Sequence, residues 1–262
     1  VNTKYHEGKV AISPDGKRMY FDRNDYYKGD LDKDEAGVNQ INLYTAEKVG
    51  GEWVNVQSAP FNSDEFSTGH PAISPDGNTL YFSSDRPGGF GGKDIYRVLR
   101  LPNGKWSRAL NLGATVNTPY DEDAPFIHSD KKTLYFSSKG HTNMGGYDIF
   151  KTVYEKRLWS DPENLKYPVN TVEDDVFYVL SASGRVGYYS SAREGGIGGQ
   201  DIYKVLLKDE FVSEHILKGI VLDKKGGSSL SARVTLIENE SKKVKGIYNS
   251  NNNTGNFIML VN

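Results

Sequence analysis

The chain has 262 residues, with 32 Lys and Arg residues against 34 Asp and Glu residues, so its formal net charge is -2. This balance, without a basic run, gives no electrostatic basis for binding nucleic acid or a membrane surface. The absence of Cys excludes disulfides, thiolate metal sites and Cys nucleophiles, and no apolar run approaches the ~20 residues of a transmembrane helix.

A repeated pattern runs through most of the chain. Its clearest copy is residues 74–96, which read as strand end, Pro-Asp-Gly turn, strand, Gly-rich loop and strand. Equivalent residues recur as Tyr20, Tyr81, Tyr135 and Tyr188, as Asp94, Asp148 and Asp201, and as Trp53, Trp106 and Trp159. The three Trp residues are 53 positions apart each time. A fixed period of this length indicates a repeat architecture.

The first unit carries an insertion at residues 23–40, which we expect to be an exposed loop between its second and third strands. Residues 30–35 in this loop resemble the opening of a calcium-binding loop. However, Glu35 stands where such a loop needs Gly, and Ile41 stands where it needs a bidentate Glu. The pattern therefore favours a solvated charged loop.

The second unit predicts four strands, at residues 71–74, 80–84, 95–99 and 106–112. Leu80-Tyr81-Phe82 in the second of these is apolar on both faces, which is typical of a strand between two neighbouring sheets. Four-stranded units of this length, stacked face to face, are the blades of a β-propeller. The sequence thus predicts an all-β fold with four propeller blades.

The fourth unit has a third strand at residues 202–206 but no Trp-bearing fourth strand. We expect a strand from upstream of Val1 to complete this blade, and earlier blades to complete a six-bladed ring, because ring closure protects the sheet edges. The propeller blades are predicted to occupy residues 1–212. Residues 213–262, with a short strand and turn expected at 218–227 and strands at 232–237 and 255–260, predict a small, incomplete β-sandwich.

Acidic residues recur in the connectors between blades. Because strands alternate in direction, we expect these connectors to lie on the same face as the loops between second and third strands. The acidic clusters predict either a cation site or a docking surface for a basic partner, while the alternative is that Asn and Asp satisfy backbone groups in turns. Recurrence in every unit favours the structural alternative. The candidate interaction face comprises Asp30, Asp32, Asp34, Asp64, Glu65, Asp121, Glu122, Asp123, Asp174 and Asp175.

Two other polar features have structural interpretations. Asp94, Asp148 and Asp201 follow Gly-rich loops, whose N–H groups their carboxylates are placed to accept. His128 is expected in a first strand beside the central channel, where other units have Ser. No hydrolase or metalloprotease motif is present, so we predict no catalytic residue, no metal ligand and no cofactor.

The pattern Ser-Pro-Asp-Gly-x-x-Leu-Tyr-Phe-Ser-Ser-Asp-Arg at residues 74–86, followed by Asp94-Ile-Tyr96, resembles the propeller repeat of the TolB family. The segments at 6–16, 60–65, 69–77 and 86–92 together resemble PorE-like outer-membrane lipoproteins of Bacteroidetes, which carry an OmpA-like domain. The tail, with Gly219-Ile-Val221 and Thr254-Gly-x-Phe257, is similar to their carboxypeptidase-regulatory-like β-sandwich.

The resemblance implies a non-enzymatic periplasmic scaffold attached to the outer membrane. Its expected partners are other proteins of a type IX secretion or motility complex, and peptidoglycan through a domain outside this chain. One alternative is a propeller that binds glycan or peptidoglycan fragments in a channel lined by residues such as His128 and Ser74. Another is the accessory propeller of a hydrolase.

Overall fold

The structure is a computed structural model that describes residues 7–24, 26–27, 30–31, 33, 37–207, 215–224, 226–239, 242–250 and 255–261. The chain divides into two compact units, one made of Val1–Val179 and Tyr188–Val205 and the other of Leu180–Gly187 and Leu206–Asn262. The boundary between residues 212 and 213 stays a prediction. In the part of the chain described, no helix is long and apolar enough to cross a membrane.

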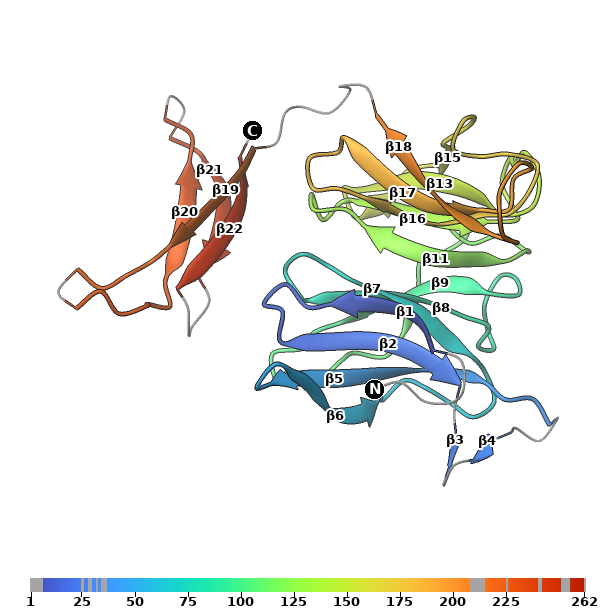
Figure 1. The fold of residues 1–262 in the computed structure, drawn as a ribbon, viewed down its shortest axis with the longest axis horizontal. Coiled ribbons are helices and arrows are strands. Elements are labelled where there is room, and N and C mark those ends of the chain that lie inside the picture. The colour runs from blue at the N-terminus through green and yellow to red at the C-terminus, as the bar shows by residue number, and fades with distance from the viewer. Residues whose placement is uncertain are drawn as a thin grey trace. The chain divides into compact units, whose positions relative to one another are not determined.

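Four antiparallel sheets follow one another along the chain (Figure 1), which confirms the predicted all-β fold with four propeller blades. The first blade contains β1 (Glu7–Ile12), β2 (Arg18–Asn24), β5 (Ile41–Val49) and β6 (Glu52–Ser58). The second contains β7 (Thr68–Ile73), β8 (Thr79–Ser84), β9 (Asp94–Leu99) and β10 (Leu110–Asn111). The third contains β11 (Glu122–Ile127), β12 (Thr133–Ser138), β13 (Asp148–Glu155), β14 (Leu158–Trp159) and β15 (Glu163–Asn164).

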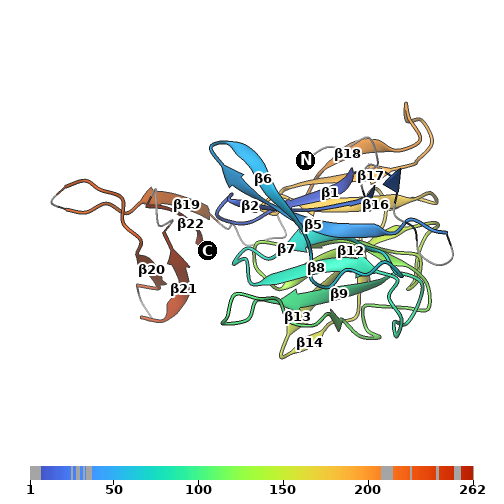
Figure 2. The same ribbon diagram turned by 90° about the horizontal axis from the view of Figure 1, so that it is seen from below.

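The fourth blade has three described strands, β16 (Asp175–Leu180), β17 (Val186–Ser191) and β18 (Asp201–Leu206). The insertion of the first blade was expected to be a loop, but β2 extends into it as far as Asn24. A short hairpin follows, formed by two strands of two residues each, β3 (Tyr26–Tyr27) and β4 (Asp30–Leu31). Figure 2 shows the same succession of blades from below.

The outermost strands differ from the prediction of one continuous strand at residues 106–112. In the second blade only Leu110–Asn111 forms a strand, and Trp106 makes an isolated bridge. The hydroxyl of Ser107 accepts the N–H of Leu99 at 3.0 Å, and the hydroxyl of Ser160 in the third blade accepts the N–H of Val153 at 3.0 Å. A serine side chain thus replaces a backbone acceptor and interrupts the strand.

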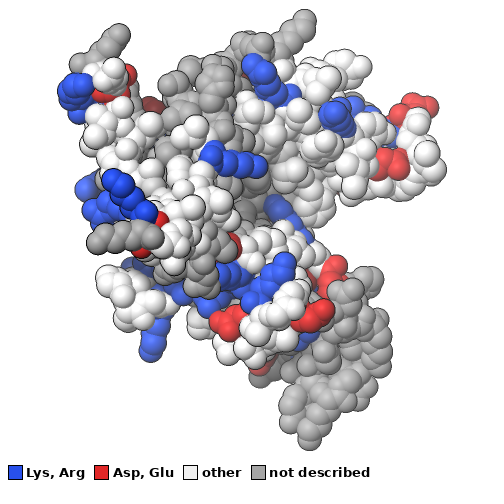
Figure 3. Space-filling view, turned by 60° about the vertical axis from the view of Figure 1, so that its left-hand side comes forward, with Lys and Arg blue, Asp and Glu red and all other residues white. Residues whose placement is uncertain are grey.

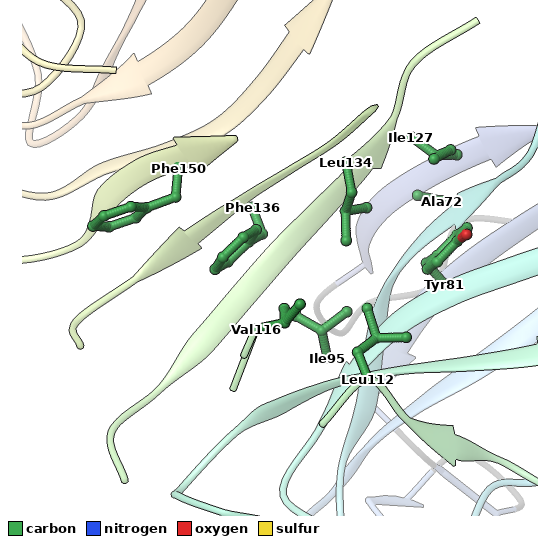
Figure 4. Packing of buried hydrophobic residues seen from close by; sticks show 9 residues of the cluster. All are labelled: Ala72, Tyr81, Ile95, Leu112, Val116, Ile127, Leu134, Phe136 and Phe150. Carbon is green, nitrogen blue, oxygen red and sulfur yellow. The ribbon is translucent and has the colours of Figure 1, made fainter. Parts of the chain in front are cut away.

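The second strands form the cores between blades, as their two apolar faces predicted. Leu80 and Phe82 are fully buried in a cluster shared with the first blade, while Tyr81, 5% exposed, lies in a cluster shared with the third. Figure 4 shows that second cluster, where Tyr81 of β8 lies near Leu134 of β12. Burying each large apolar side chain stabilises the stack by about 1.5–3 kcal/mol.

The first strands of the second and third blades depart from regular pairing. The register of β7 with β8 shifts between Gly69 and Ala72, and that of β11 with β12 shifts between Asp123 and Phe126. His70, Ala124 and Phe177 occupy equivalent positions with φ values of 52°, 50° and 60°. The two register shifts are β-bulges, which redirect side chains at defined points of a strand. They place unlike residues close together where the first strands meet.

In the second compact part of the chain, the described residues from 215 onward form two pairs of strands. β19 (His215–Ile220) pairs with β22 (Asn256–Val261), and β20 (Arg233–Ile237) pairs with β21 (Val244–Asn249). The strands expected near residues 218, 232–237 and 255–260 are therefore present, while β21 was not expected. A complete β-sandwich stays a prediction.

Candidate functional site

The loops between second and third strands lie against the connectors that lead to the next blade, as the alternation of strands predicted. The N–H of Gly92 donates to the carbonyl of Tyr120 at 3.0 Å, and the N–H of Glu122 donates to that of Lys93 at 2.7 Å. In the next blade the N–H of Asp175 donates to the carbonyl of Tyr147 at 2.7 Å. We call the surface formed by residues 85–93, 113–121, 139–147, 166–174 and 192–200 the loop face.

An Asn in each of three connectors clamps the third strand of the preceding blade. Asn117 accepts the N–H of Ile95 at 2.8 Å and donates to its carbonyl at 3.0 Å. Asn170 makes the same pair of bonds with Ile149, at 2.8 and 2.9 Å. Asn62 does so with Leu43, at 3.1 and 2.7 Å. The structural role predicted for these Asn residues is confirmed.

Three Asp residues brace the tips of the loops. The carboxylate of Asp94 accepts the N–H of Phe90 at 2.6 Å, and Asp201 accepts the N–H of Ile197 at 2.7 Å. The N–H of Met144 likewise donates to Asp148. This is the arrangement predicted from the Gly-rich loops. It holds each tip in one backbone conformation while its side chain points outward.

The tip residues themselves are apolar and exposed. Phe90, Met144 and Ile197 occupy equivalent positions and are 49%, 43% and 102% exposed. On the neighbouring connectors Tyr120 is 63% exposed and Val172 is 71% exposed. The loop face therefore carries a row of rigidly held apolar side chains, which the sequence reasoning overlooked because it concentrated on the acids.

A groove of about 680 Å³ opens beside these tips, between the second and third blades. Phe90 and Tyr120 contribute to its walls, together with His141, Phe150 and Pro162. Close packing shapes this region, because a Cβ on Gly91 would overlap the carbonyl oxygen of Tyr120. The groove combines aromatic walls with polar edges, a composition typical of binding surfaces.

The predicted acidic residues divide into three groups. Asp64 and Glu65 are exposed, and the half-buried Asp121 and Asp174 accept N–H groups of the adjoining loops. Glu122, Asp123 and Asp175 are buried and bonded within the protein. The expectation that these three belong to an exposed face is therefore wrong, because folding uses their carboxylates. Asp32, Asp34 and the side chain of Asp30 lie outside the described residues.

A second polar site lies where the first strands meet. Nδ1 of His70 is hydrogen bonded to Asp123, and Nζ of Lys93 contacts the other oxygen of Asp123 at 2.9 Å. Nζ of Lys9 donates to the carbonyl of Pro125 at 2.6 Å. Residues from three blades thus form one cluster, which we call the central cluster.

Charge and burial set the properties of the central cluster. Burial alone would raise the pKa of Asp123, but His70 and Lys93 outweigh it and hold that pKa well below its usual range. Burial lowers the pKa of Lys9 to about 8, against the opposing charges of Asp123 and Asp22. Burial raises the pKa of Asp22, which accepts the backbone N–H of His70.

The central cluster breaks the symmetry of the repeat. The position of Asp123 is held by Gly8 and Gly69 in the first two blades, and a Cβ on Gly8 would overlap the carboxylate of Asp22. Small residues in two blades therefore make room for acidic groups. The signal was present in the sequence as differences between equivalent positions of the first strands, but their cross-blade contacts are not local.

His128 lies elsewhere than expected. It follows β11 and is 3% exposed, and its N–H donates to the carbonyl of Thr133 at 2.8 Å. Ser74 makes the equivalent turn bond with Thr79. His128 is thus a buried turn residue and does not line a channel. Among the described residues no group of three acidic or His side chains is arranged to hold a metal.

No known protein-family model matches the chain, and no curated protein does. Among solved structures, TolB from Acinetobacter baumannii matches 99% of this chain at 14% identity, with a TM-score of 0.52. Putative TolB from Agrobacterium tumefaciens matches 98% of this chain and 90% of its own at 14% identity, with a TM-score of 0.41. An alpha-L-arabinofuranosidase from Lactobacillus brevis matches 78% of this chain and 73% of its own at 12% identity, with a TM-score of 0.50.

The chain spans 55% of the length of the Acinetobacter TolB structure. At identities this low, the similarity concerns the fold alone. The blades seen in the structure and this similarity agree: the chain has a TolB-like β-propeller fold.

Proposed function

We propose that the propeller is a non-enzymatic protein-interaction module that docks a partner on its loop face. The observation that carries this proposal is the row of equivalent tips at Phe90, Met144 and Ile197. Each tip is exposed, apolar and anchored through its backbone to an Asp carboxylate. Because the backbone of each tip is already held in place, binding costs little loop-ordering entropy, so the tips contribute efficiently to an interface.

The cellular setting rests on the resemblance to PorE-like lipoproteins and on the TolB-like fold. We place the protein in the periplasm, attached to the outer membrane, within a type IX secretion or motility complex. A domain outside this chain would bind peptidoglycan. The tail at 213–262 would be the carboxypeptidase-regulatory-like sandwich of such a protein, joined to the propeller at 1–212.

The test is affinity capture from cell envelopes, followed by cross-linking of the captured complex. The variant Phe90→Ser, Met144→Ser, Ile197→Ser removes the three tips. A matched control changes three exposed apolar residues on or near the turns at the other ends of the strands, Val49→Ser, Leu101→Ser and Leu158→Ser. We expect the tip variant to lose a partner that the control retains. If the control variant lost the partner while the tip variant retained it, the loop face would be rejected as the docking surface.

The central cluster favours a second candidate, a propeller that binds glycan or peptidoglycan fragments near the meeting point of the first strands. Its support is the symmetry-breaking set of His70, Lys93 and Asp123, which offers both donors and acceptors. Titration with muropeptides, followed by NMR of the histidine ring protons, tests it. An unchanged His70 signal at saturating muropeptide would dispose of this candidate.

A further inference from the structure

A pocket of about 300 Å³ lies between the first and second blades, away from the loop face and the central cluster. Arg18, at the start of β2, and Arg100, just after β9, both line it. Its aromatic walls are Tyr20 and Trp106, whose rings meet edge to face at 6.2 Å. Phe61 and Glu47 line it as well, so the pocket combines two guanidinium groups with three aromatic rings and one carboxylate.

The two Arg residues differ in their partners. Arg18 forms an ion pair with Glu47 at 3.0 Å, and their side chains are 34% and 47% exposed. The guanidinium of Arg100 stacks 4.9 Å from the ring of Trp106, and no acidic partner of it is found among the described residues. Burial raises the pKa of Tyr20, while the charges of Arg18 and Arg100 oppose the increase, so both cations act on the same pocket.

The corresponding junction between the second and third blades places its charge differently. The aromatic pair is repeated there, because Tyr81 meets Trp159 edge to face at 6.4 Å. However, Thr79 stands at the position of Arg18, and Tyr154 stands at the position of Arg100. One guanidinium is present there, that of Arg97, which stacks 5.1 Å from the ring of Tyr154. The aromatic pair therefore belongs to the packing of both junctions, whereas the combination of Arg18 and Arg100 is particular to the first.

The charges near the pocket are mixed. Lys105, next to Trp106, is exposed. Nζ of Lys48 lies 5.5 Å from the ring of Trp53, in a cluster apart from the pocket. Figure 3 shows Lys and Arg together with Asp and Glu on one side of the molecule. Because Arg18 is paired with Glu47, Arg100 is the guanidinium left to attract an anion in the pocket.

We propose that this pocket binds a carboxylate of an acidic peptide segment on a partner protein. Arg100 would hold the carboxylate, Trp106 and Tyr20 would contact its methylene groups, and the exposed Lys105 would attract a neighbouring acidic residue. Glu47 competes for Arg18 and so limits the affinity. This site is separate from the loop face, and its assignment does not depend on the function proposed there.

The experiment titrates the full chain with a capped hexaglutamate peptide at low ionic strength, using calorimetry. We expect Arg100→Gln to weaken binding about tenfold, since a charge-assisted hydrogen bond is lost. Arg97→Gln is the matched control, because Arg97 stacks on Tyr154 at 5.1 Å in the neighbouring pocket and should leave the affinity unchanged. Glu47→Gln should strengthen binding by freeing Arg18, an effect that structural damage does not produce.

Absence of binding by the unmodified chain would overturn the proposal, and so would equal affinity of Arg100→Gln and the unmodified chain. Displacement of the peptide by an equal concentration of inorganic phosphate would also overturn it, because the site would then be a general anion site. Loss of binding confined to Arg100→Gln, with a gain in Glu47→Gln, would support it.

Discussion

The buried Asn clamp offers a direct measure of what the repeated polar residues contribute. Asn117 is 1% exposed, and its side chain satisfies the N–H of Ile95, which is also buried. In Asn117→Ala this N–H loses its acceptor where water has no access. The carbonyl of Ile95 keeps a donor, the N–H of Leu112 at 3.1 Å, so only one backbone group is left unsatisfied.

The expected cost follows from these contacts. One unsatisfied buried N–H costs about 1–3 kcal/mol, and each hydrogen bond lost elsewhere costs about 1 kcal/mol. Asn117 also donates to Asn111 at 2.8 Å, so we expect Asn117→Ala to lower the free energy of unfolding by about 2–4 kcal/mol. Asn62→Ala is the matched control. Asn62 makes the same clamp on Leu43 but is half-exposed, so water can replace it and the loss should be about 1 kcal/mol.

Urea unfolding followed by Trp fluorescence measures both variants. All three Trp residues of the chain, at 53, 106 and 159, belong to the propeller unit, so the signal does not report on the tail. The decisive quantity is the difference between the two variants in the free energy of unfolding that each loses. If Asn117→Ala lost no more than Asn62→Ala, the argument that burial of the N–H group sets the cost would be refuted.

Three further predictions concern charge and packing. The pKa of Lys9 falls from 10.5 to about 8 in the folded chain, so the charged form of Lys9 destabilises the fold. Lys9→Met should therefore raise the free energy of unfolding, measured with urea. This gain should shrink as pH rises from about 8 to about 10.5, because Lys9 of the unmodified chain then loses its charge on folding. The lowered pKa of Asp123 stabilises the folded state at neutral pH, and this contribution is lost progressively as pH falls from about 4 towards the lowered pKa. Asp123→Asn should therefore cost about 3–5 kcal/mol at pH 7 and less as pH falls through that range, and an equal cost at neutral pH and in strong acid would contradict the pairing with His70. Gly91→Ala should cost about 1–3 kcal/mol in thermal unfolding because its Cβ overlaps a carbonyl, whereas Gly199→Ala, with open space around it, should cost little.

The repeat made the fold predictable. The apolar run at Leu80–Phe82 predicts burial on both faces, and the carboxylate of Asp94 lies only four positions from the N–H of Phe90 that it accepts. Both inferences depend on contacts close in sequence or repeated in each blade. The interrupted outer strands were not predictable in this way, because the hydroxyl of Ser107 competes with a backbone acceptor and sequence periodicity does not reveal which one prevails.

The candidate sites depend on contacts that the repeat does not describe. His70 and Asp123 are 53 positions apart, and their pairing requires two first strands to meet at bulged positions. An acidic residue in a connector does not have to be exposed. The carboxylate of Glu122 is buried and accepts a hydrogen bond from Thr118 within the turn that it stabilises. Its burial raises the pKa of Glu122, and three hydrogen bonds from Thr118 and Ser138 oppose that increase.

The distinction between repeated and unrepeated residues assigns roles within one architecture. A residue found at the same position in every blade, such as Asn117, answers a need that every blade has, namely satisfying backbone groups where two sheets meet. A residue found once, such as Arg100, replaces a residue that suffices elsewhere, so packing between blades does not require its charge. Partner binding is therefore to be sought first where a charged or exposed side chain departs from its equivalents, and Arg100 meets that condition beside an aromatic pair that is repeated at the next junction.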